Sequence, residues 1–384
     1  MPWQDRDGRV VATAFVLHAM LVGTWAGRVP AIKHALGLSD TELGAALFGM
    51  AAGTLLGSWL GGPLARRLGA ATVVRGGIPA MAAALVASAF ARDLTALFVA
   101  LAGFGTLGAI VDVAMNTVAV AAEHDRRRPL MSGFHGAWSV GLLLGALGAS
   151  AAAAAGVGPE RHFTAVAVVV AGAALTVLAA LPGPAPPARA AGHVRTAWSA
   201  ELVVLGAIAF CSFFAEGAAA DWSAVYLHDR AGAGAALAAA AFAGFSIAMA
   251  AARLAGDRIV ASVGPVALAR RAGLTAAAGL GLALAVPAPG AGIAGFALMG
   301  AGLAPIVPLV LSAAGAAAPG VEEALSRVLL IAYSGSIVGP AAIGFAAGRV
   351  ELRAALLIPL GLIICIVLAA GRIQPAAGGE LART

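Results

Sequence analysis

About twelve long apolar stretches, separated by short polar segments, constrain this chain more than any other feature of its sequence. Each is roughly 18 to 25 residues long, enough for an α-helix to cross the ~30 Å hydrocarbon core of a bilayer. A water-soluble fold needs more polar surface than a chain that is 61% hydrophobic and 11% charged supplies. The sequence therefore predicts an all-α polytopic membrane protein with about twelve transmembrane helices.

The expected spans fall into two groups of six. The first group covers residues 9–28, 42–65, 73–91, 94–122, 131–154 and 162–181. The second group covers residues 201–225, 234–255, 264–286, 290–313, 324–346 and 351–371. The segment between them begins with four prolines in six residues, which is typical of an exposed linker. We therefore expect a six-helix half over residues 1–181, a cytoplasmic linker over 182–200 and a second six-helix half over 201–384.

Basic residues set the expected orientation. If the amino terminus is cytoplasmic, the cytoplasmic segments hold about twice as many basic residues as the outer segments. This excess predicts a multi-pass protein of the bacterial inner (plasma) membrane with both termini in the cytoplasm. It also accounts for the net charge of +6 without nucleic acid as a partner.

A short internal repeat relates the two halves. Residues 123–136 read EHDRRRPLMSGFHG and residues 322–335 read EEALSRVLLIAYSG. Their alignment pairs Glu123 with Glu322, Arg128 with Arg327, Gly136 with Gly335 and, further on, Gly145 with Gly344. Two six-helix repeats with a binding site near the membrane midplane are the arrangement of secondary transporters, so the repeat favours that class.

Asp112 is the most informative ionisable residue, because it stands alone in the span over residues 94–122. It lies about ten residues, or ~15 Å, from the cytoplasmic end of that span. An ionised aspartate there costs at least ~2.5–3.5 kcal/mol, so we expect it to face a cavity and to load and release a proton. The alternative is a hydrogen-bonded aspartate that only ties two helices together. Asn116 lies one turn further on the same face and is a candidate substrate ligand.

The next span runs antiparallel and carries three more candidate substrate contacts. Counting inward from the loop places His135 level with Asn116, and Trp138 and Ser139 level with Asp112. If these faces meet, they form a polar patch with an aromatic floor, which suits a sugar-like or zwitterionic solute. The alternatives are a histidine bonded to the loop and a tryptophan that only packs.

In the span over residues 201–225, Glu216 is a second candidate for proton coupling. Gly217 and the alanines after it allow this helix to loosen, as interrupted helices at transport sites do. Asp221, near the outer surface, is either a solvated helix-end charge or the partner of Arg28 in an outer gate. Trp222 and Tyr226 are candidate substrate contacts or, alternatively, interfacial aromatic residues.

A charged cluster, Arg253, Asp257 and Arg258, follows the eighth span and is a candidate inner gate. Its alternative is an ordinary positive-inside loop. The sequence has no Walker loop, no HExxH motif, no clustered Cys/His set and no G-x-S-x-G elbow. We therefore expect neither an ATP-driven pump nor an enzyme, and no cofactor.

Two loop motifs resemble the glycine/arginine signature of major facilitator transporters. They are GGPLARRLG at residues 61–69 and RLAGDR at residues 253–258. The first has Arg66 where the signature carries an acid, whereas the second has Asp257. Within that superfamily, DVAMN at residues 112–116 and GAGLAPIVP at residues 300–308 resemble the fucose-permease branch.

The resemblance covers essentially the whole chain. It implies proton symport of a sugar, a proton- and substrate-binding role for Asp112 and a ligand role for Asn116. It also implies an acid in the first span, but residues 13–27 contain no carboxylate. Glu216 is the candidate to replace that acid.

The leading hypothesis is a proton-coupled symporter for a small polar, sugar-like solute that works by alternating access. We expect protons, the solute and the lipid bilayer as partners, and a monomer, because the fold needs no second chain. Two alternatives stay open: a proton antiporter that exports a drug or natural product, and a receptor that binds without transport. The substrate and the direction of flux do not follow from the sequence.

Overall fold

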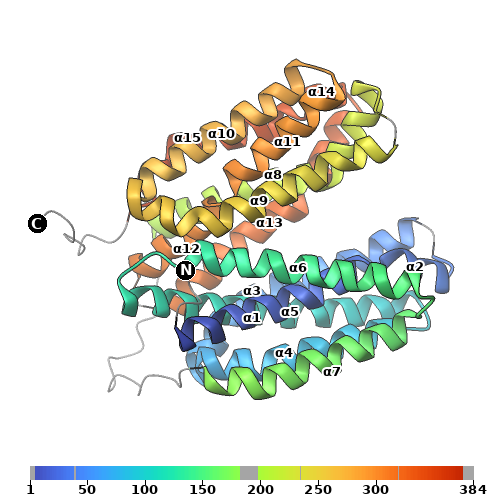
Figure 1. Cartoon of the computed structure of the whole chain (residues 1–384), viewed down its shortest axis with the longest axis vertical. Coiled ribbons are helices and arrows are strands. Elements are labelled where there is room, and N and C mark those ends of the chain that lie inside the picture. Colours follow the sequence, from blue (N-terminus) through green and yellow to red (C-terminus); the bar gives the residue numbers. More distant parts are fainter. Residues whose placement is uncertain (1–4, 39, 182–197, 234, 319, 375–384) are drawn as a thin grey trace, which may run out of the picture. The chain divides into compact units, whose positions relative to one another are not determined.

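A computed structural model describes residues 5–38, 40–181, 198–233, 235–318 and 320–374 (Figure 1). Within these residues the chain is helical and has no β-strand. Ten of the described helices are long and apolar enough to cross a membrane. Two further long helices are α9 (Ala235–Val263), which carries three charged residues, and α10 (Pro265–Ala285), which carries two. Together they account for the predicted all-α fold of about twelve transmembrane helices.

The predicted spans fall on helices whose ends differ from the prediction by up to eight residues, the largest difference being at the end of α9. The first half contains α1 (Arg6–Ala26), α2 (Val29–Ala35), α3 (Asp40–Leu68), α4 (Ala70–Ala89), α5 (Leu94–Arg126), α6 (Met131–Ala154), α7 (Pro159–Val177) and η2 (Leu178–Ala180). The second half contains α8 (Ala200–Ala231), α9, α10, α11 (Pro289–Leu303), α12 (Ile306–Ala317), α13 (Val321–Ala347), α14 (Leu352–Ala355), α15 (Leu357–Ala369) and η3 (Ala370–Arg372). The short helix α2 and the division of the span over 290–313 into α11 and α12 were not predicted.

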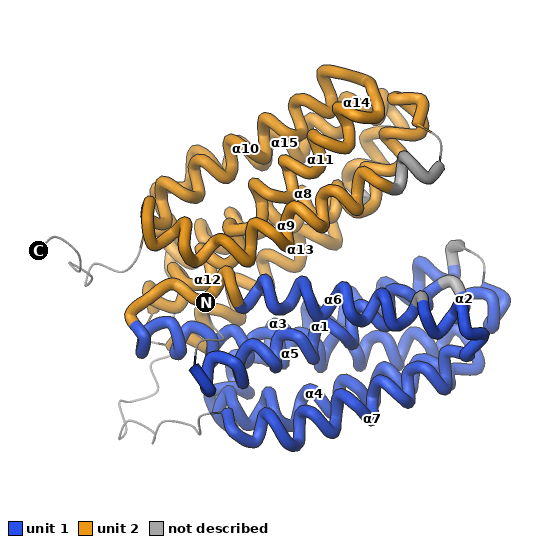
Figure 2. Tube along the Cα trace, viewed as in Figure 1, with its two compact units in different colours: residues 1–126, 134–195 blue, residues 127–133, 196–384 orange. Residues whose placement is uncertain are grey.

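The chain divides into two compact units (Figure 2). Unit 1 comprises residues 1–126 and 134–195, and unit 2 comprises residues 127–133 and 196–384. The segment 127–133 therefore groups with the second unit, although the sequence analysis assigned it to the first half. Most of the expected linker, residues 182–197, lies outside the described residues.

The two units repeat the same helix spacing. Helices α1, α3, α4 and α5 begin at Arg6, Asp40, Ala70 and Leu94, and α8, α9, α10 and α11 begin at Ala200, Ala235, Pro265 and Pro289. Glycine contacts follow this spacing: Gly141 and Gly145 of α6 face the carbonyls of Val16 and Met20 on α1. In unit 2, Gly335 and Gly339 of α13 face the carbonyls of Phe210 and Phe214 on α8. The register predicted from sequence, with Gly145 opposite Gly344, is therefore wrong, because Gly145 occupies the position of Gly339.

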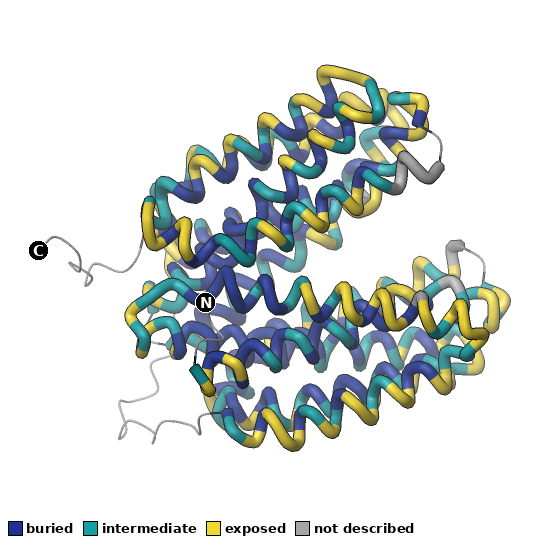
Figure 3. Tube along the Cα trace, in the orientation of Figure 1, coloured by how far each residue is buried: buried dark blue, intermediate teal, exposed yellow. Residues whose placement is uncertain are grey.

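Burial differs among the helices of unit 1. In α5, residues from Gly108 to Val120 are almost continuously buried (Figure 3). In contrast, α7 exposes large apolar side chains, among them Val168, Val169 and Leu175. An apolar helix face of this kind is stable against lipid but not against water. Helix α5, which carries Asp112 and Asn116, is therefore an interior helix of unit 1.

Close helix packing relies on glycine, as expected where lipid removes the hydrophobic drive between helices. Four glycines of α3, each one turn from the next, contact α5: Gly49, Gly53, Gly57 and Gly61. A Cβ atom at Gly53 would overlap the carbonyl oxygen of Ala102, so only glycine permits this approach. This contact fixes α5, which carries Asp112 and Asn116.

Candidate functional site

A buried polar cluster in unit 1 joins α1, α5 and α6 through His18. The imidazole is 5% exposed, its Nε2 lies 3.1 Å from the carbonyl oxygen of Gly108, and its Nδ1 accepts the indole N–H of Trp138 at 3.1 Å. A carbonyl only accepts and an indole N–H only donates, so the ring must carry its hydrogen on Nε2 and is neutral. Sequence analysis missed His18, although it is the only ionisable side chain between Arg9 and Arg28.

The predicted pair of Asp112 and Asn116 lies on α5, one turn beyond Gly108. Asp112 is 7% exposed and Asn116 is fully buried. The Asn116 amide nitrogen donates to Asp112 Oδ1 at 3.1 Å and to the Asp112 carbonyl at 2.9 Å. The Asn116 Oδ1 atom is buried and has no hydrogen-bond partner. The structure thus brings the predicted pair together and leaves a buried acceptor beside it.

The three predicted contacts on α6 are half-buried and have different neighbours. Trp138 uses its only polar atom on His18, so its remaining contribution is the aromatic face. His135 packs edge-on against the ring of Phe15, with centroids 5.7 Å apart. The Ser139 hydroxyl donates to the carbonyl of His135 on its own helix at 3.1 Å. Trp138 is therefore linked to α5 through His18, which bonds the carbonyl of Gly108.

Unit 2 contains an ion pair between a half-buried glutamate and a buried arginine. Glu216 Oε2 on α8 lies 3.7 Å from Arg253 Nη2 on α9, with side-chain exposures of 21% and 7%. Ser212 donates its hydroxyl to Glu216 Oε1 at 3.1 Å. Arg253, which the sequence places in a candidate inner gate with Asp257 and Arg258, thus contacts Glu216.

Arg253 also reaches the interruption between α11 and α12. Pro305 and Pro308 have no amide hydrogen, so the carbonyls of Ala301 and Ala304 lose their usual helical donors. The Arg253 Nε–H donates to the Ala304 carbonyl at 3.5 Å, in place of the missing amide of residue 308. Helix α8, in contrast, continues without a break through Gly217, where the sequence analysis expected loosening.

The other members of the predicted inner gate lie at the end of α9. The buried carboxylate of Asp257 accepts the backbone N–H of Gly133 at 3.1 and 3.0 Å. This contact holds the segment 127–133 in unit 2. Arg258, the next residue, is exposed.

The predicted outer-gate residues belong to different units. Arg28 is 3% exposed, and its guanidinium donates to the carbonyl of Val157 within unit 1. Asp221 is exposed on α8.

The two aromatic residues near Asp221 have structural contacts in unit 2. Tyr226 is fully buried, and its hydroxyl donates to the carbonyl of Ala283 on α10 at 3.0 Å. The ring of Trp222 packs beside Gly344. Trp222 also lines an open pocket that includes the ion pair of Arg230 with Glu351, which are 3.4 Å apart.

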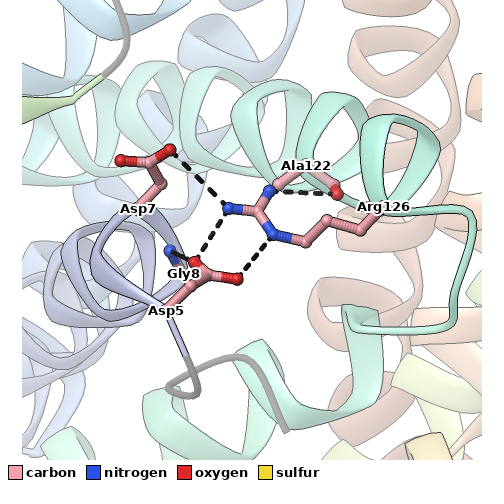
Figure 4. Close-up of polar contacts among 5 residues, drawn as sticks. All are labelled: Asp5, Asp7, Gly8, Ala122 and Arg126. Carbon is pink, nitrogen blue, oxygen red and sulfur yellow. Dashed lines mark hydrogen bonds and ion pairs between the residues drawn. The ribbon is translucent and has the colours of Figure 1, made fainter.

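The amino-terminal end of α1 is anchored by a polar cluster that the sequence analysis did not predict (Figure 4). Arg126, at the end of α5, donates to both carboxylate oxygens of Asp5 at 2.9 Å. Asp7 lies 3.8 Å from the same guanidinium. Asp5 also accepts the backbone N–H of Gly8 at 2.7 Å and so caps α1. This cluster fixes the two helices that carry His18 and Asp112.

The family of this chain follows from its similarity to known proteins. Residues 11–322 match the family model of the Major Facilitator Superfamily. The chain belongs to this superfamily. An uncharacterized transporter, y4wD, of Sinorhizobium fredii is 35% identical over 377 residues, which cover 95% of this chain and 96% of that protein. Membrane protein MosC of Rhizobium meliloti is 31% identical and covers 92% and 87% of the two chains.

Solved structures of low sequence identity share the fold. The fucose:proton symporter FucP of E. coli, in a single-residue variant, superposes with a TM-score of 0.80 at 16% identity, over 95% of this chain and 98% of that one. The human organic anion transporter MFSD10 superposes with a TM-score of 0.73 at 18% identity, over 96% and 100% of the two chains. Because the chain belongs to the Major Facilitator Superfamily, it is a multi-pass secondary transporter, not an enzyme, that acts on a small molecule and resides in a lipid bilayer.

Proposed function

We propose that this transporter moves a small polar, sugar-like solute by symport with protons through an alternating-access cycle. The observation that carries the proposal is the buried pair of Asp112 and Asn116 in the middle of α5. A carboxyl group at this depth is costly unless it serves a function, and a proton neutralises it. Asp112 is therefore the proposed proton carrier.

The polar atoms around Asp112 suit a solute with hydroxyl groups. Asn116 Oδ1 is a buried acceptor without a donor, and such an atom is costly unless a ligand or water supplies one. Trp138 offers a flat face for C–H contacts, because its N–H is already bonded to His18. We assign Asn116 and Trp138 to solute binding, with His135 and Ser139 beside them on α6. The fucose:proton symporter FucP transports a solute of this class, and its likeness to this chain is one of fold.

Glu216 is the proposed second proton-coupling residue, and its partner Arg253 links it to the interruption before α12. Trp222 and Tyr226 remain predicted solute contacts, although the Tyr226 hydroxyl already binds a backbone carbonyl. For gating we propose Asp257 with Arg253 and Arg258 on the inner side, and Arg28 with Asp221 on the outer side. We also propose a monomer in the bacterial inner membrane with cytoplasmic termini.

The test is the external pH of lightly buffered, anaerobic cells that express the protein and receive pulses of sugars and polyols. Symport predicts alkalinisation with one class of solute. The Asp112→Asn variant should lose this signal, whereas Asp125→Asn, an exposed position on the same helix, should keep it. Silence across the panel at normal expression contradicts sugar symport. Proton-dependent resistance to apolar cations in the same cells would then favour the drug exporter.

A further inference from the structure

His18 occupies a position in the cluster that the proposed function does not use. It lies on α1, faces α5 through Gly108 and faces α6 through Trp138. Both ring nitrogens are engaged in the neutral form, one as donor and one as acceptor. The imidazole therefore has one hydrogen-bonding arrangement that satisfies all its neighbours.

Protonation of His18 is incompatible with this arrangement. A second proton would sit on Nδ1 and point at the indole N–H of Trp138, whose nitrogen is 3.1 Å away. An indole cannot accept in the ring plane, so two donors would face each other in a buried site. Proton uptake at His18 and the contact with Trp138 therefore exclude one another.

The groups around His18 come from three neighbouring helices. From α5, the carbonyl of Gly108 faces the imidazole, and Asp112 lies one helical turn further along that helix. From α4, the side chain of Met81 lies beside Gly108 and is apolar. From α6, the facing polar group is Trp138, and His135 is turned against Phe15. The Trp138 N–H is thus the group that opposes a charge on His18 from within the cluster.

We propose that Trp138 acts as a movable block on His18, a second proton-accepting residue beside Asp112. When the indole is displaced, Nδ1 is exposed and His18 takes up a proton that Asp112 can share. A solute that lies against the face of Trp138 would displace the indole, which links solute binding to proton uptake. This last step depends on the proposed symport, whereas the exclusion between Trp138 and the proton does not.

The experiment is ¹⁵N NMR of the full-length protein in lipid nanodiscs, with the histidine rings labelled. His18→Gln assigns the signal, because the amide of glutamine can bind both neighbours but carries no imidazole. At about pH 5.5, where a free histidine is mostly charged, the unaltered protein should show His18 neutral with hydrogen on Nε2. Trp138→Phe should show it doubly protonated. Trp25→Phe, a buried tryptophan of α1 that packs against Phe163, is the matched control and should leave His18 neutral.

Three results would overturn the proposal: hydrogen on Nδ1 in the unaltered protein, the same charge on His18 with and without Trp138, or an equal effect of Trp25→Phe. If Trp138→Phe does not fold, benzothienylalanine at position 138 keeps the ring shape and removes the N–H. The measurement needs no solute and no flux. A failed search for a transported sugar therefore leaves this test intact, and a failure here leaves the symport proposal standing.

Discussion

The carboxylate of Glu216 lies 3.7 Å from the guanidinium of Arg253, and Arg253 in turn bonds the carbonyl of Ala304 where α11 ends. Three helices of unit 2 thus meet at one ion pair. Such a pair adds little net stability over an apolar replacement, but removing one partner leaves the other charge buried. We therefore expect a change in the charge of Glu216 to act, through Arg253, on the helix that is interrupted at Ala304.

The first prediction concerns this pair. Glu216→Gln should lower the free energy of unfolding by about 3 kcal/mol, because it removes the negative charge that lies 3.7 Å from the buried Arg253. The double variant Glu216→Gln with Arg253→Met should recover most of that loss. Thermal unfolding of the purified protein in detergent measures both. Additive losses in the double variant would show that the two residues act independently.

The second prediction concerns the interruption of the tenth span. Pro308→Ala supplies the amide that the Ala304 carbonyl lacks, so it should raise stability by about 1 kcal/mol and extend the helix through residue 304. Solute flux should fall several-fold if the interruption is needed for movement. Pro79→Ala, inside the unbroken helix α4, is the matched control. Unchanged flux in Pro308→Ala would show that the interruption serves packing alone.

The third prediction concerns the glycine contact of α3 with α5. Gly53→Leu should reduce stability by at least ~1–3 kcal/mol, because its side chain would overlap the Ala102 backbone. Gly103→Leu on α5 has open space around its Cβ position and should have little effect. The folded fraction after extraction, measured by size-exclusion chromatography, separates the two. Equal yields would contradict the close approach.

Much of this fold follows from patterns within single segments. The length of each apolar run predicts its helix, and the spacing of Asp112 and Asn116 predicts their shared face. The hydrogen bond between them was found only in the structure. Pro305 and Pro308 also predict an interruption, although the sequence analysis treated their segment as one span. The neighbouring residues in the sequence are sufficient to predict these features.

The remaining contacts depend on how separate helices pack. His18 meets Trp138 because α1 lies against α6 through Gly141 and Gly145, and no local pattern indicates this. The contact between Arg253 and Glu216 was not predicted for the same reason, because the two residues lie on different helices, α9 and α8. The predicted alignment of the two halves is five positions out of register. It paired residues of the same type, whereas the helix starts give the correct offset.

The central claim, that Asp112 carries the coupled proton, is tested most directly in proteoliposomes with the solute that the cell experiment identifies. Asp112→Asn should still exchange labelled solute across the membrane, because an amide can bind hydroxyl groups. Under an imposed pH gradient it should accumulate none, whereas the unaltered protein concentrates the solute. Accumulation by Asp112→Asn equal to that of the unaltered protein would contradict the account, because the proton would then be carried elsewhere.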